Sequence, residues 1–203
     1  MKRGFIFTGM LVLSYIAFGQ QIKNRNIELD DLMTLLNVSG YELFCFDIAD
    51  MLNERYDIVF VTKEYAAGQE IASTNIRAEQ INPEDSVEKI SFGFLPANND
   101  STRVMRISVP GIGTFAAPEF KLKGLSMIGL DRKVYRYRTR SFKLGEIKNG
   151  EFAPLILFAS GWYDEISNVL RFCGEREIDP DMSSEILKDV PHHYVIGVEF
   201  IKK

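Results

Sequence analysis

The sequence predicts an α+β protein, built mainly from antiparallel β-sheet with two or three short helices packed on it. Three observations lead to this fold class. Strongly extended runs occupy residues 132–144 and 152–160, turn-rich segments separate most other apolar runs, and few stretches show the apolar spacing of a helix. Successive strands joined by short turns favour antiparallel pairing.

The two extended runs form the predicted centre of the fold. In a strand over 132–144, the side chains of Arg136, Arg138 and Arg140 share one face, whereas a helix would scatter them around its circumference. The run 152–160 is apolar on both faces, which favours an inner strand that begins or bulges at Pro154. Asn149-Gly150 gives a turn between them, so we expect a hairpin.

The N-terminal segment has the pattern of a secretory signal peptide. Lys2 and Arg3 precede an apolar run over 5–18, and Ala17 and Gly19 place small residues where a signal peptidase requires them. A membrane anchor is the alternative, but it needs about 20 apolar residues, and this run is shorter and interrupted. We therefore expect cleavage near Gly19, a single β-rich domain over 20–203 without an integral membrane span, and a periplasmic or extracellular location.

Charge and cysteine content narrow the possible partners. Loss of residues 1–19 leaves 22 basic and 28 acidic residues, a net charge near −6, which disfavours a nucleic-acid partner. The cysteines are Cys45 and Cys173. Export makes a disulfide between them the slightly favoured expectation, and two small buried thiols flanked by aromatic residues the alternative.

The remaining elements follow from periodicity and turn residues, from the N-terminus onward. Residues 28–37 have helical apolar spacing with acids in the first turn, which predicts a short helix lying on a sheet and stopping near Gly40. Extended patterns predict a buried strand at 41–48 and further strands at 56–65, 87–95 and 102–109, the last two as a hairpin. For 46–53 a helix competes, and 69–81 fits an exposed strand or a loop.

The second half of the chain is less regular outside the central hairpin. Prolines and glycines over 110–129 indicate a segment that crosses between parts of the sheet. Residues 161–165 predict a turn, and 166–177 fit a strand or a short helix equally well. Asp181 or Ser183 could cap a short helix that ends before Pro191, and 192–203 predicts a closing strand.

Two groups of residues are candidates for ligand binding. The row Arg136, Arg138 and Arg140 could grip an anion such as a sulfated sugar or a phosphate, although a solvated strand face is the favoured interpretation. Trp162, Tyr163 and Asp164 combine flat rings with an acid, the mixture expected where a sugar ring stacks. The alternative for the tryptophan is a core or rim position.

The pattern favours neither catalysis nor metal binding. His192 and His193 are adjacent, so on a strand they point to opposite faces and cannot share one metal ion. No nucleophile-elbow pattern occurs, and the scattered acids lack calcium-loop spacing. We expect no catalytic residue, no metal and no cofactor.

In general character the chain resembles the small exported proteins of unknown function of Bacteroides-type bacteria. The resemblance rests on the segment Met1–Gly19, the Gln20-Gln21 start and the β-rich body. Export and the missing catalytic constellations favour a non-catalytic binding or assembly module for a glycan or an envelope protein. The alternative is a periplasmic or secreted hydrolase that uses carboxylates together with His192 or His193.

Overall fold

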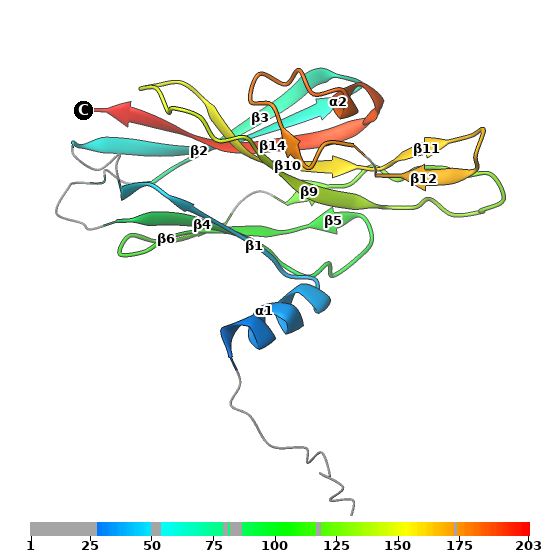
Figure 1. Cartoon of the computed structure of the whole chain (residues 1–203), viewed down its shortest axis with the longest axis horizontal. Coiled ribbons are helices and arrows are strands. Elements are labelled where there is room, and N and C mark those ends of the chain that lie inside the picture. Colours follow the sequence, from blue (N-terminus) through cyan, green and yellow to red (C-terminus); the bar gives the residue numbers. More distant parts are fainter. Residues whose placement is uncertain (1–27, 50–53, 79–80, 82–86, 117–118, 173) are drawn as a thin grey trace, which may run out of the picture.

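Two sheets, each mostly antiparallel, lie face to face (Figure 1). The computed structural model describes residues 28–49, 54–78, 81, 87–116, 119–172 and 174–203. Sheet A has the order β1 (Glu42–Asp47), β4 (Lys89–Phe94), β6 (Met105–Val109) and β7 (Gly113–Ala116). Sheet B has the order β13 (Glu177–Ile178), β9 (Tyr137–Phe142), β10 (Ala153–Ser160), β14 (His192–Lys202), β2 (Tyr56–Ala66) and β3 (Gln69–Arg77), with β13 parallel to β9.

Short elements complete the described chain. β5 (Thr102–Arg103) pairs with β8 (Phe120–Lys121), and β11 (Trp162–Asp164) pairs with β12 (Val169–Arg171). The helices are α1 (Leu29–Val38) and α2 (Ile186–Asp189). Mostly β-structure with few helices and largely antiparallel pairing is the predicted class, and the structure confirms it at this level.

The main hydrophobic core fills the space between the two sheets. Alternate residues of each strand turn inward, so β4 contributes Phe92 and Phe94 while β10 contributes Phe158. The Phe94 and Phe158 rings lie 4.9 Å apart, centroid to centroid, which joins the sheets at this point. A smaller core, including Leu157 and Val195, lies on the opposite face of sheet B and is covered by α2 (Figure 1).

The central hairpin forms as predicted, with a shorter first strand. β10 pairs antiparallel with β9, and its register shifts between Pro154 and Ile156, which confirms a bulge at the proline. The first run enters the sheet only at Tyr137, because Val134 instead forms a β-bridge with Leu125. The ambiguous segments 69–81 and 166–177 both contain strands, β3 and β12.

The structure corrects two expectations about the helices, one on packing and one on capping. α1 forms where predicted but buries none of its residues, and it lies beyond sheet A instead of packing on a sheet (Figure 1). A capping box between Glu28 and Asp31 holds its start, so its local sequence suffices without packing. α2 begins after Glu185, because Asp181 accepts a hydrogen bond from the Ser183 amide in the preceding turn.

β1 is an edge strand with one buried face. Phe44 and Phe46 pack against the core, whereas Leu43 and Cys45 are exposed, so the strand is half-buried where the sequence predicted a buried one. The Cys45 side chain is exposed, so the alternative of a small buried thiol is wrong for this residue. Cys173 lies outside the described residues, so the predicted disulfide stays a prediction.

The predicted signal peptide over 1–19 also lies outside the described residues. Within the described part of the chain, no helix has both the length and the apolar character that a bilayer crossing demands.

The turn between β2 and β3 gives a first testable prediction. Ala67 and Gly68 both have positive φ, +49° and +75°, as a type I′ turn requires, and alanine is strained there. We expect Ala67→Asn to raise the free energy of unfolding by about 0.5–1 kcal/mol, because asparagine tolerates this conformation. Urea denaturation measures the change. Gly68→Ala should shift stability the other way, and equal effects of both variants would contradict the assignment.

Candidate functional site

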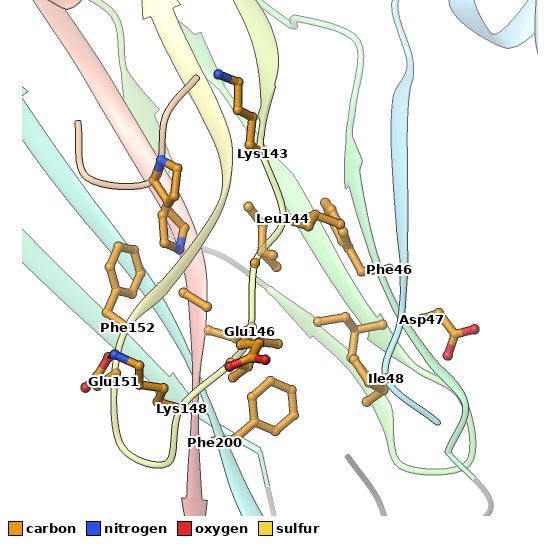
Figure 2. Close-up of a pocket in the computed structure, with 18 residues that line it drawn as sticks. Phe46, Asp47, Ile48, Lys143, Leu144, Glu146, Lys148, Glu151, Phe152 and Phe200 are labelled. Atoms are coloured by element: carbon orange, nitrogen blue, oxygen red, sulfur yellow. Dashed lines mark ion pairs between the residues drawn. The ribbon is translucent and has the colours of Figure 1, made fainter. Parts of the chain in front are cut away.

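A cavity of about 370 Å³ opens at one end of the molecule, between the two sheets (Figure 2). Its walls come from segments far apart in sequence, chiefly the end of β1, the connection from β9 to β10 with the start of β10, and β14. The apolar lining includes Phe46 and Ile48 on one side, Leu144 and Phe152 on another, and Phe200 at the base. This volume lies within the range of ligand pockets, about 300–1,000 Å³, which are also mainly apolar.

The connection between β9 and β10 creates the opening. Residues 143–152 leave the sheet instead of making a tight turn, and they line much of the cavity. The segment is tied to the C-terminal strand at Asn149-Gly150: the Gly150 amide donates to the Phe200 carbonyl at 2.8 Å, and Asn149 Oδ1 accepts from the Lys202 amide at 2.7 Å. The predicted turn residues therefore anchor one wall of the cavity.

Charges of both signs surround the apolar lining. Lys143 pairs with Asp179 at 2.5 Å, and Lys148 pairs with Glu151 at 3.5 Å. Asp47 points away from the cavity in Figure 2 and caps the Ala49 amide at 2.9 Å. The cavity therefore has an apolar lining and a rim that carries both amines and carboxylates. Such a site suits the binding of an apolar group.

The three predicted arginines have different surroundings. Arg136 and Arg138 are exposed and line a polar hollow of about 390 Å³ together with Glu42. Arg138 lies over the Phe172 ring at 5.6 Å. Arg140 donates to the carbonyls of Glu175, at 2.9 Å, and Phe172, so it holds the segment after β12 in place. The hollow therefore has two arginines that could attract an anion. The carboxylate of Glu42 beside them would repel it.

The predicted sugar-stacking residues do not form one platform. Trp162 packs against the small core beside α2, and Tyr163, as the next residue in β11, lies on the other side of the strand. Asp164 accepts hydrogen bonds from Ile166, Ser167 and Arg171 and thereby closes the β11–β12 turn. Their ligand-binding role stays a prediction.

His192 belongs to a chain of buried polar groups that the sequence did not reveal. Its Nε2 lies 2.9 Å from Glu64 Oε1, and its Nδ1 lies 2.7 Å from the Tyr137 hydroxyl. Because the Lys123 amide donates to the Tyr137 oxygen at 2.9 Å, the phenol proton is directed to Nδ1 and the Nε2 proton to Glu64. The sequence offered little signal for it, because Glu64 shares its strand with other polar residues, Asp57, Thr62 and Lys63.

The electrostatics of this chain favour a structural role. Burial lowers the pKa of His192 against the opposing effect of Glu64, and burial raises the pKa of Tyr137 to about 12. Both rings are therefore neutral near pH 7, and the histidine is only 2% exposed. A nucleophilic hydroxyl needs a lowered pKa and access to substrate, whereas the pKa of Tyr137 is raised and His192 is buried.

His193 lies on the opposite face of β14, as the adjacent histidines predicted. Its ring stacks on Tyr65 with centroids 4.9 Å apart, and neither ring nitrogen has a hydrogen-bond partner. Among the residues that the structure describes, no group of three or more histidine, cysteine, aspartate or glutamate side chains is placed to hold a metal ion.

A family model described as Domain of unknown function (DUF5041) matches residues 11–202. The chain belongs to this family. The match spans the cavity, the arginine hollow and both histidines of this DUF5041 protein. Neither the curated proteins nor the solved structures contain a match to it.

The lining of the cavity in this DUF5041 protein was beyond sequence reasoning. Its apolar residues look like ordinary core residues in the sequence, and only the departure of 143–152 from the sheet leaves part of them uncovered. One available signal was the length of the β9–β10 connection, which exceeds a tight hairpin and includes the exposed Leu144.

Proposed function

We propose that this DUF5041 protein is an exported, non-catalytic binding module that receives apolar side chains of an envelope protein in the cavity between its sheets. The observation that carries the proposal is the cavity itself: about 370 Å³, lined by aromatic and aliphatic side chains, and open at the end of the molecule. Binding at an apolar site of this kind is favourable, because the partner removes apolar surface from water.

The rim favours a polypeptide over other occupants. Lys143, Lys148, Glu146 and Glu151 place amines and carboxylates around the same opening. A protein segment supplies apolar side chains together with backbone donors, acceptors and charges of either sign, which matches such a rim. A fatty acid or an anionic lipid carries one sign of charge, so it would complement the amines of the rim but would be repelled by the carboxylates of Glu146 and Glu151.

Leu144 gives the sharpest variant for a test because it lines the cavity and is 66% exposed, so the fold does not depend on its burial. We expect Leu144→Asp to weaken binding of peptides with a leucine or phenylalanine anchor at least tenfold, because it adds a charge beside the apolar floor. Selection from a displayed peptide library, followed by calorimetric titration of the winners, measures the effect.

Ile166→Asp is the matched control. Ile166 is fully exposed in the β11–β12 turn, so the same substitution there should leave peptide affinity unchanged. Parallel titrations with palmitate and with neutral phospholipid vesicles separate a lipid ligand from a peptide. Peptide binding that is equally strong in both variants, or binding of lipid alone, would refute the proposal.

A glycan is a second candidate ligand, supported by the exposed Arg136 and Arg138 and the adjacent Phe172 ring. Guanidinium groups bind sulfate esters bidentately, and an aromatic ring can stack on a sugar. An array of sulfated and neutral glycans tests this candidate. If a glycan is the ligand, the array should retain wild type and Leu144→Asp but should not retain the Arg136→Gln/Arg138→Gln double variant.

A hydrolase is a further candidate because Glu64 and His192 form a carboxylate–histidine pair. If the pair served general acid–base catalysis, Glu64→Gln should lower turnover of a substrate at least about a hundredfold. A panel of chromogenic esters and glycosides measures this. No turnover by wild type, or turnover that is unchanged in Glu64→Gln, removes the candidate.

A further inference from the structure

The outer edge of sheet B is a long strand that is open to a further strand. β3 runs from Gln69 to Arg77, and every residue except Ile76 is exposed. The other edge strands of the described sheets, β13, β1 and β7, hold two, six and four residues. Proteins usually protect such edges with lysine, proline or inward-pointing charges, whereas β3 is uncharged between Glu70 and Arg77.

The hydrogen-bond pattern shows which backbone groups are free at this edge. Ala78 donates to Ile58 of β2 at 2.9 Å, and residues along an antiparallel strand alternate between bonding toward one neighbour and toward the other. The amides and carbonyls of Ser73 and Asn75 therefore point away from β2. They form a row at the outer edge that no strand in the described part of the chain pairs with.

We propose that β3 pairs antiparallel with β3 of a second copy of this chain, with the two-fold axis at Thr74. This register places Ser73 opposite Asn75 of the other copy, where the outward groups complete four backbone hydrogen bonds. Thr74 lies opposite Thr74, and Ala72 lies opposite Ile76. None of these side chains is charged, so this register brings no like charges together.

Charge complementarity at the ends of β3 supports this register. Ile71 has no partner in β2 and forms a bulge. Glu70 precedes it, and its side chain lies on the same face as Tyr65, to which it is hydrogen-bonded. Arg77 lies on that face too, beside Asp57. In the dimer each Arg77 approaches residues 70 and 71 of the other copy, so an Arg77–Glu70 pair forms at both ends.

The proposal is independent of the cavity, which opens between the sheets and has no lining residue from β3. Pairing at this edge would join two copies into one continuous sheet. A strand from a different protein could use the same backbone groups, but it would not reproduce the symmetric pairing of Glu70 with Arg77.

Sedimentation velocity over a range of concentrations, on protein expressed as the full chain, tests the proposal. Wild type should show a monomer–dimer equilibrium. Thr74→Lys and Thr74→Glu should each raise the dimer dissociation constant about five- to tenfold by placing like charges directly opposite. An equimolar mixture of the two should form a heterodimer tighter than either homodimer.

Two further variants separate pairing from general effects. Asn75→Pro removes an outward amide and with it two hydrogen bonds of the dimer, so it should raise the dissociation constant about tenfold or more. Thr114→Lys adds the same charge to β7, the exposed edge of sheet A, and should leave association unchanged. A monomeric wild type, or a Lys/Glu mixture no tighter than the homodimers, overturns the proposal.

Discussion

Gly197→Ala is expected to lower the free energy of unfolding by about 3 kcal/mol. A Cβ atom at position 197 would lie 2.1 Å from the Ala153 carbonyl oxygen and 2.7 Å from the Phe152 ring. The oxygen belongs to the backbone of the neighbouring strand at its bulge, so it cannot rotate aside. Chemical denaturation of wild type and variant measures the loss.

Gly145→Ala provides the control on the same side of the molecule. Gly145 lies in the β9–β10 connection, and a Cβ atom there would meet nothing within 4 Å. The added methyl should leave stability unchanged or raise it by about 0.4–1 kcal/mol. Equal losses of stability in the two variants would show that the close approach of β10 and β14 does not explain why position 197 requires glycine.

Acidification should unfold the protein in part through His193. Burial holds the pKa of His193 at about 4, below the ordinary value of 6.5, and the nearby His192 acts in the same direction. The neutral ring is therefore favoured in the folded state, and its stabilising contribution is complete above pH 6.5. It is lost as pH falls toward 4, by about 3 kcal/mol.

His193→Phe isolates this contribution. Phenylalanine keeps a flat ring against Tyr65 and cannot take up a proton, and it leaves no buried nitrogen without a partner. The variant should be less sensitive to pH between 6.5 and 4 than wild type, as measured by urea denaturation at several pH values. Identical pH profiles for the two proteins would contradict the assignment.

Local patterns predicted the longer strands because the relevant signals lie within single segments, but they missed β7 in the expected crossing segment and β11 where a turn was expected. The alternation Tyr194, Ile196, Val198 and Phe200 turned out to face the main core, and Pro154 marked the bulge of β10. The helix over 28–37 was equally legible. The position of this helix outside the sheets could not be predicted. Apolar spacing shows that a helix has an apolar face, but it does not show which element that face contacts.

Features that depend on distant segments could not be predicted. The division into two sheets places β1 beside β4 and β14 beside β2, pairings that no local pattern specifies. The contact of Glu64 with His192 depends on one of these pairings. The cavity depends on Phe46, Leu144 and Phe200 meeting at one end of the molecule.

Site-specific crosslinking in living cells tests the central claim, that the cavity between the sheets receives an envelope protein. A benzophenone amino acid replaces Leu144 at the cavity, or Ile166 at the β11–β12 turn, and the cells are irradiated before the adducts are separated by mass. The account predicts a defined protein adduct from position 144 that is absent from position 166. Lipid adducts alone, no adduct, or the same adducts from both positions would contradict it.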